Sequence, residues 1–202
     1  MPASHLQTVR AMAYNNAWAN HRLLAACARL TQVEFEAPRT GFYPSIQATL
    51  NHILVIDRFY VDALEGGTLG PAAWADPVPC PTVSELRPAQ AAVDRRLIAW
   101  CEALEEAGAD QIIHVHRGTR VQTERADSLL LHLYQHQIHH RGQGARDAQR
   151  YCRTAAATRR ILLDRRGAAA HGRIRRARVD RGDGLAGVRL LDHVSRSHTA
   201  RP

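Results

Sequence analysis

Apolar side chains recur at steps of three and four residues along four stretches of the chain, a spacing typical of one face of an α-helix. The first stretch covers about residues 4–30 and has Asn16 and Asn20 on the same face. The next two cover about residues 45–65 and 82–107, and the last begins near residue 125. The pattern therefore predicts four long helices.

The residues that flank these stretches are typical of helix ends. Ser45 is a suitable N-cap for the second helix, because its side chain can accept a hydrogen bond from the first turn. Thr82 and Glu85 have the spacing of a capping box at the start of the third helix. Pro88 lies beyond the first turn of that helix, where the lost N–H group favours a kink.

A short β-hairpin is predicted before the fourth helix. Residues 112–116 and 119–123 flank Arg117 and Gly118, which are suited to a tight turn. The links that precede the second and third helices are both long enough to cross the bundle. We therefore expect an all-α fold, an antiparallel four-helix bundle with crossover connections and one small hairpin.

Charge divides the chain into two parts. The 202 residues are enough for one compact domain. Residues 1–143 hold 12 arginines and 14 acidic residues, whereas residues 144–202 hold 15 arginines and 5 aspartates. Lysine is absent from the sequence. We therefore expect a helix bundle over residues 1–143 and a separate basic tail over residues 144–202.

The cysteines and the N-terminus point to a reducing compartment. The sequence has no CxxC spacing, no basic and apolar leader, and no apolar run near the length of about 20 residues that spans a bilayer. We expect a soluble, cytoplasmic protein with buried, reduced thiols. The four cysteines are Cys27, Cys80, Cys101 and Cys152.

Histidines gather on the predicted fourth helix. His132, His136 and His140 are spaced one turn apart, and His139 lies off that line. A histidine pair four residues apart can present two imidazoles to one divalent cation. His52 lies in the apolar stripe of the second helix and could supply a third nitrogen. The spacing alone leaves two interpretations open, a three-histidine metal site or a core histidine beside a solvated histidine face.

Three stretches resemble the DinB/YfiT-like family of metal-binding four-helix bundles. They are YNNAWAN at residues 14–20, LNHILVIDR at residues 50–58 and LHLYQHQIHHRGQ at residues 131–143. The resemblance covers essentially residues 1–143. It implies helices in an up-down-down-up order and one divalent metal ion held by His52, His136 and His140. The ion could be zinc, nickel, iron or manganese, since imidazole ligands suit all four.

Other residues of these stretches have interpretations of their own. Asp57 and Arg141 could pair across two helices and hold the metal ligands in place, although an ordinary interhelical ion pair fits equally well. Gly142 is interpreted as a site of close helix packing. Trp18 and Asn20 are interpreted as bundle core and cap.

The resemblance implies a metal-dependent enzyme that activates a thiol or water nucleophile, as a thiol S-transferase or a hydrolase. Its partners would be a small-molecule substrate, a low-molecular-weight thiol and a second copy of the chain in a homodimer. The sequence names no catalytic residue. His132, Tyr134 and Tyr43 are placed near the pocket without a role. The alternative is a non-catalytic metal-binding or stress-response module with the same ligands.

The family pattern stops after Gln143. A one-base insertion would explain this, because the codons that can encode residues 144–163 also permit a family-like ending in a shifted frame. The fourth helix is expected to continue to about residue 163 on helix propensity alone, and disorder is expected beyond residue 165. A basic tail can also bind nucleic acid non-specifically, but we expect no specific nucleic-acid partner.

Overall fold

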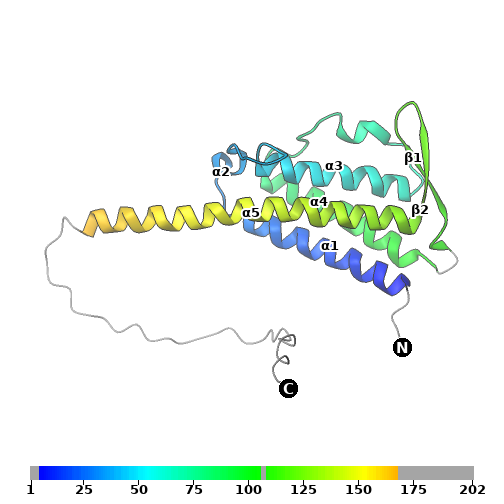
Figure 1. The fold of residues 1–202 in the computed structure, drawn as a ribbon, viewed down its shortest axis with the longest axis horizontal. Coiled ribbons are helices and arrows are strands. Elements are labelled where there is room, and N and C mark those ends of the chain that lie inside the picture. The colour runs from blue at the N-terminus through cyan, green and yellow to red at the C-terminus, as the bar shows by residue number, and fades with distance from the viewer. Residues whose placement is uncertain (1–4, 106–107, 168–202) are drawn as a thin grey trace, which may run out of the picture. The chain divides into compact units, whose positions relative to one another are not determined.

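The computed structural model describes residues 5–105 and 108–167, with side chains as far as residue 148. Four long α-helices, α1, α3, α4 and α5, make up most of this part, and a short helix α2 and a 3-10 helix η1 lie in the links. A two-stranded hairpin, β1 and β2, precedes α5 (Figure 1). The element bounds are α1 His5–Cys27, α2 Gln32–Glu36, α3 Ile46–Leu64, η1 Gly70–Trp74, α4 Val83–Ala103, β1 Ile112–His116, β2 Val121–Arg125 and α5 Ala126–Gly167.

The predicted helix caps are confirmed. The Ser45 hydroxyl accepts a hydrogen bond from the Ala48 N–H group at 3.0 Å, at the start of α3. Thr82 and Glu85 form the capping box of α4. Thr31 forms a second capping box, at α2, which the sequence analysis missed although the spacing from Thr31 to Glu34 carries the same signal.

Contacts near the helix ends show in which direction each long helix runs. Arg10, near the start of α1, donates to the carbonyl of Leu104 just after α4, at 2.9 Å, so α1 and α4 are antiparallel. The Trp100 indole donates to the carbonyl of Leu64, and both residues lie near the ends of their helices, so α3 and α4 are parallel. The Tyr134 hydroxyl donates to the carbonyl of Val9, so α5 begins beside the start of α1. This is the up-down-down-up order, and the fold class is confirmed.

The hairpin lies at the end of the bundle where α3 ends and α5 begins (Figure 1). Its strands are antiparallel, with His116 opposite Val121. The second strand begins two residues later than predicted, because the turn takes in Arg117 through Arg120, with a hydrogen bond between their backbones and Gly118 at φ 83°. A positive φ is readily adopted by glycine alone.

Two sequence interpretations within α1 and α5 are wrong. Trp18 is 58% exposed, and the Arg22 guanidinium carbon lies 4.7 Å from the centroid of the Trp18 ring. Trp18 is therefore not part of the core. A Cβ at Gly142 would meet nothing within 4 Å. At Gly144 a Cβ would lie 3.4 Å from the Leu50 side chain, in ordinary van der Waals contact, so α5 faces α3 one residue beyond the predicted domain boundary.

The apolar interior is continuous through the bundle and includes three buried cysteines, Cys27, Cys80 and Cys101. The Cys152 side chain lies outside the described part. Among the described helices, none has the length and apolarity needed to cross a bilayer. The disorder and nucleic-acid contacts considered for the tail fall almost wholly on residues 168–202, outside the described residues.

Candidate metal centre

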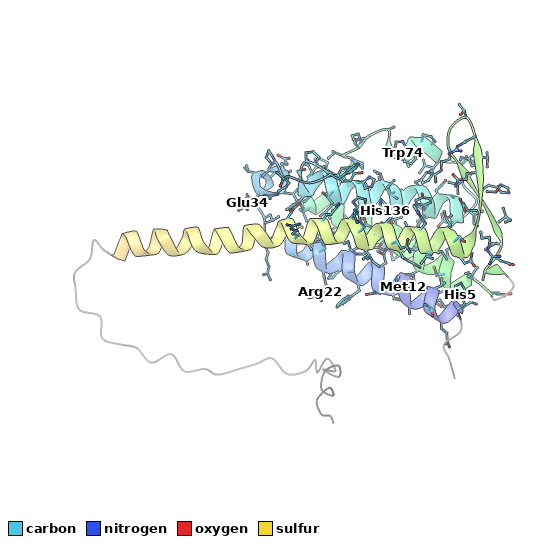
Figure 2. The ribbon with its side chains drawn as sticks, viewed as in Figure 1. His5, Met12, Arg22, Glu34, Trp74 and His136 are labelled. Atoms are coloured by element: carbon cyan, nitrogen blue, oxygen red, sulfur yellow. The ribbon has the colours of Figure 1, made fainter. Side chains whose placement is uncertain are left out.

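α3 and α5 bring His52, His136 and His140 together. His52 lies two turns after the Ser45 cap of α3, and His136 and His140 are one turn apart on the part of α5 that runs antiparallel beside it. Figure 2 shows His136 on that part of α5. One ring nitrogen from each residue lies within 4.8 Å of the other two. We call these three residues the histidine cluster. The set predicted from the sequence is therefore assembled in the fold, and it could hold a metal ion.

The three rings crowd a single space. The Nε2 atoms of His52 and His136 are 2.9 Å apart. The ring centroids of His140 lie 4.7 Å from His52 and 4.4 Å from His136. Two imidazole nitrogens at hydrogen-bond distance can share only one proton between them, so at least one lone pair points into the cluster.

Hydrogen bonds within the cluster do not satisfy all of its nitrogens. His140 Nδ1 lies 2.9 Å from Gln143 Oε1. The amide oxygen can only accept, so this contact places the proton on Nδ1 and leaves the Nε2 lone pair for a ligand. Within the described residues, His136 Nδ1 is a buried nitrogen without a hydrogen-bond partner. Buried polar atoms are seldom left so, but Nδ1 lies across the ring from Nε2, the atom of His136 that faces His52, so its missing partner is separate from any ligand of the cluster.

Burial keeps all three imidazoles neutral. Burial, followed by repulsion from His140, lowers the pKa of His52 to about 4. Burial, followed by repulsion from His140 and His52, lowers the pKa of His136 to about 3. The pKa of His140 is also lowered, mainly by burial, although the Gln143 hydrogen bond opposes the shift. Because metal ions bind the neutral imidazole, protons do not compete for these ligands near neutral pH.

The neighbouring residues named from the sequence fall in three different places. The Tyr43 ring stacks on His52, with ring centroids 4.4 Å apart, and so covers one side of the cluster. His132 is exposed and lies one turn before His136, nearer the start of α5, with its ring centroid 5.5 Å from that of Tyr60. Tyr134 points away, because its hydroxyl is bonded to Val9 of α1. Only Tyr43 belongs to the surroundings of the histidine cluster.

Asp57 and Arg141 are linked through an amide and not by a direct ion pair. The Gln137 amide nitrogen donates to Asp57 Oδ1, and Arg141 Nη1 lies 3.5 Å from Gln137 Oε1. Asp57 is 1% exposed, and burial, followed by repulsion from Asp94, raises its pKa well above the ordinary value. The two predicted residues therefore lie in one buried network beside the ligands, with Gln137 between them.

Sequence reasoning gave no role to Gln143 or Gln137. Gln143 stands three residues after His140 on one helix, a spacing at which side chains meet, so its contact was available from the sequence. The role of Gln137 was not, because it depends on which helix packs against that side of α5.

The fold and the site together define a helix bundle with a three-histidine cluster between two antiparallel helices. The family model described as the DinB family matches residues 1–149. The chain belongs to the DinB family, as its motifs predicted.

The fold is also similar to a solved structure, described as the crystal structure of a DinB-like protein from Bacillus cereus. The TM-score is 0.53 at 13% sequence identity, and the match covers 67% of this chain and 85% of the other. A comparison with curated proteins found no match.

Proposed function

We propose that this protein binds one divalent metal ion through His52, His136 and His140 and acts as a metal-dependent enzyme on a small molecule. The observation that carries the proposal is the convergence of three neutral imidazoles, with one ring nitrogen of each within 4.8 Å of the other two. Three protein ligands leave at least one coordination position for a water molecule or substrate, as in catalytic zinc sites.

The chemistry proposed is activation of a thiol or a water molecule, giving a thiol S-transferase or a hydrolase. A bound divalent ion lowers the pKa of a coordinated nucleophile and so supplies it in deprotonated form near neutral pH. Gln143 holds the His140 ring so that its Nε2 lone pair faces the cluster. Tyr43 covers His52 and restricts the access of water from that side.

The metal content of the purified full chain tests the binding step. Zinc, nickel, iron and manganese are each measured by elemental analysis in the wild type, in His52→Ala and in His132→Ala. His132 is the matched control, because it lies one turn from His136 and outside the cluster. We expect stoichiometric metal in the wild type and in His132→Ala, and none in His52→Ala. Full metal content in His52→Ala contradicts the proposed ligand set.

Turnover separates an enzyme from a non-catalytic binding module. Metal-loaded wild type and His136→Ala are assayed with electrophilic substrates and each of bacillithiol, mycothiol and glutathione, and with ester and amide substrates without thiol. We expect thiol consumption or hydrolysis by the wild type alone. A metal-loaded protein that turns over no combination supports the metal-binding module instead.

A further inference from the structure

Polar side chains from all four long helices meet in the bundle interior, beside the ligand-bearing segment of α5. Six of them are buried, at 6% exposure or less, and the seventh, Arg141, is partly buried. We call this group the interhelical polar network. Its members are Asn16 and Asn20 of α1, Asp57 of α3, Gln90 and Asp94 of α4, and Gln137 and Arg141 of α5.

The network has a fixed hydrogen-bond direction on the α1 side. Arg141 Nη1 donates to Asn16 Oδ1, and to Asn20 Oδ1 at 3.1 Å. The Asn20 amide nitrogen in turn donates to Asp94 Oδ1 at 2.9 Å. An asparagine amide has one accepting and one donating end, so the guanidinium on α5 and the carboxylate on α4 together orient the α1 amides.

A second amide closes the network on the α3 side. The Gln90 amide nitrogen donates to Asp57 Oδ2 at 2.6 Å and lies 3.2 Å from Asp94 Oδ1. Gln137 donates to the other Asp57 oxygen. Both oxygens of Asp57 therefore accept hydrogen bonds, one from α4 and one from α5, and the four helices are joined at one level of the bundle.

The α5 members of the network are the residues that directly follow two metal ligands in the chain. Gln137 follows His136 and Arg141 follows His140, and neighbouring residues of a helix lie about 100° apart around its axis. A rotation of α5 by about 20° would move a ring nitrogen roughly 6 Å from the axis by about 2 Å. That displacement equals a whole metal–nitrogen bond of about 2.0–2.1 Å, so the rotation of α5 decides whether the three imidazoles share one ion.

We infer that α1 and α4, which supply none of the three imidazoles, set the rotation of α5 against α3, with Asn16, Asn20 and Asp94 as positioning residues for the metal centre. Each acts through another side chain. Asn16 and Asn20 hold the Arg141 guanidinium, and Asp94 orients the two asparagines. The inference rests on the proposed metal site, because positioning has a functional effect only if the imidazoles bind an ion.

Cobalt(II) binding to the full chain tests this, because the visible absorption bands of Co²⁺ report ligand geometry and a titration gives its dissociation constant. Asn16→Leu has a similar size but cannot accept the Arg141 hydrogen bond. Asn16→Asp keeps an accepting oxygen for Arg141 but loses the amide nitrogen that lies 3.5 Å from Asp94 Oδ1. Tyr134→Phe is the control, since it removes a different hydrogen bond between α5 and α1. Urea unfolding of the metal-free variants measures how much each change costs in stability.

We expect Asn16→Leu to weaken Co²⁺ binding by about 10- to 100-fold and to change the visible bands. Asn16→Asp should recover part of the affinity and of the spectrum, because it keeps the acceptor for Arg141 but not the donor to Asp94. Tyr134→Phe should leave both unchanged even where it lowers stability. Asp94→Asn keeps the side-chain shape and gives a second variant, with a smaller loss in the same direction, if Asn16→Leu does not fold.

These measurements distinguish failure of the proposed function from failure of this inference alone. A wild type that binds no Co²⁺ overturns the proposed function and this inference with it. A wild type that binds Co²⁺, together with an Asn16→Leu variant of unchanged affinity and spectrum, overturns only the inference. An equal loss of affinity in Asn16→Leu and Tyr134→Phe also overturns it, because the effect is then general loosening of the bundle.

Discussion

The histidine cluster and the interhelical polar network are neighbours on α5, but their polar atoms are satisfied differently. In the network, donors and acceptors alternate, so that a guanidinium, four amides and two carboxylates satisfy one another. In the histidine cluster, three side chains of one kind face each other and His136 Nδ1 has no partner among the described residues. The unlike groups of the network satisfy one another within the protein, whereas the like groups of the cluster leave ring lone pairs that face one another.

Of the changes that test this contrast, removal of the Arg141 guanidinium is expected to have the largest effect on stability. Arg141→Met removes two hydrogen bonds from the guanidinium to Asn16 and Asn20, and its attraction to two buried aspartates. A hydrogen bond that involves a charged group contributes about 1.5–3 kcal/mol, so we expect the free energy of unfolding, measured by urea on metal-free protein, to fall by about 3–5 kcal/mol. Arg96→Met is the control. Arg96 Nη2 lies 2.5 Å from Glu65 Oε2 in an ion pair that is exposed to solvent, and such pairs contribute about 0–1 kcal/mol. Similar losses in the two variants would contradict the role given to the network.

The network also predicts a pH dependence through Asp94. Burial raises the pKa of Asp94 to about 6, although hydrogen bonds from Asn20 and Gln90 and attraction to Arg141 and Arg95 oppose the shift. Between about pH 4 and pH 6 the folded protein therefore keeps a proton that the unfolded chain has released, so stability from this group falls as the pH rises.

Asp94→Asn lacks that proton, and it also removes the repulsion that helps to raise the pKa of Asp57. Both effects make the difference between the unfolding free energies of wild type and variant fall as the pH rises. We expect the difference, wild type minus variant, to fall by up to about 3 kcal/mol from about pH 4 to pH 7. Urea unfolding across this range, without metal, measures it. A difference that stays constant or rises with pH is incompatible with a raised pKa at Asp94.

Metal should stabilise the protein only through the histidine cluster. An ion present at about 100 times its dissociation constant adds about 2.7 kcal/mol to the free energy of unfolding if it binds the folded state alone. We expect this gain in the wild type and in His132→Ala, reversed by a chelator, and no gain in His52→Ala. An equal gain in His52→Ala would place the bound ion elsewhere.

The adjacent residues His136 and Gln137 of α5 allow the histidine cluster and the network to be compared directly, with the smallest expected changes in stability. In metal-free protein, His136→Met removes a buried nitrogen without a partner and also one hydrogen bond, to His52 Nε2. The two effects oppose each other at about 1 kcal/mol each, so the free energy of unfolding is expected to change little. Gln137→Met removes a donor to Asp57 and is expected to lower it by about 1–3 kcal/mol. Thermal and urea unfolding of both variants check this difference. Destabilisation of similar size in both would show that the histidine cluster is satisfied without a ligand.

Local signals in the sequence were sufficient for most of the fold. The three- and four-residue apolar spacing predicted α1, α3, α4 and α5, and the side chains of Ser45 and Thr82 cap helices as expected. The hairpin strand was displaced because turn length depends on backbone φ at Gly118. α2 was missed although its capping box was present, because a helix of five residues is too short to show a period.

One part of the candidate site was also predictable from local sequence signals, and another part was not. The histidine cluster was predictable because His136 and His140 are one turn apart, and a family resemblance added His52. The network was not, although Asn16 and Asn20 stood in an apolar stripe from the start. Their presence there signals a buried polar partner, but Asp94 and Arg141 are 74 and 121 residues from Asn20, and no local pattern connects them.

The sequence by itself determined which segments are helical, where their caps lie and which histidines share a helix face, because these properties depend on residues within a turn or two of one another. Only the tertiary structure decided that Gln137 separates Asp57 from Arg141, that Gly144 and not Gly142 faces α3, and that Trp18 faces outward. Those outcomes depend on the rotation and spacing of whole helices, which are set by packing among side chains far apart in the chain.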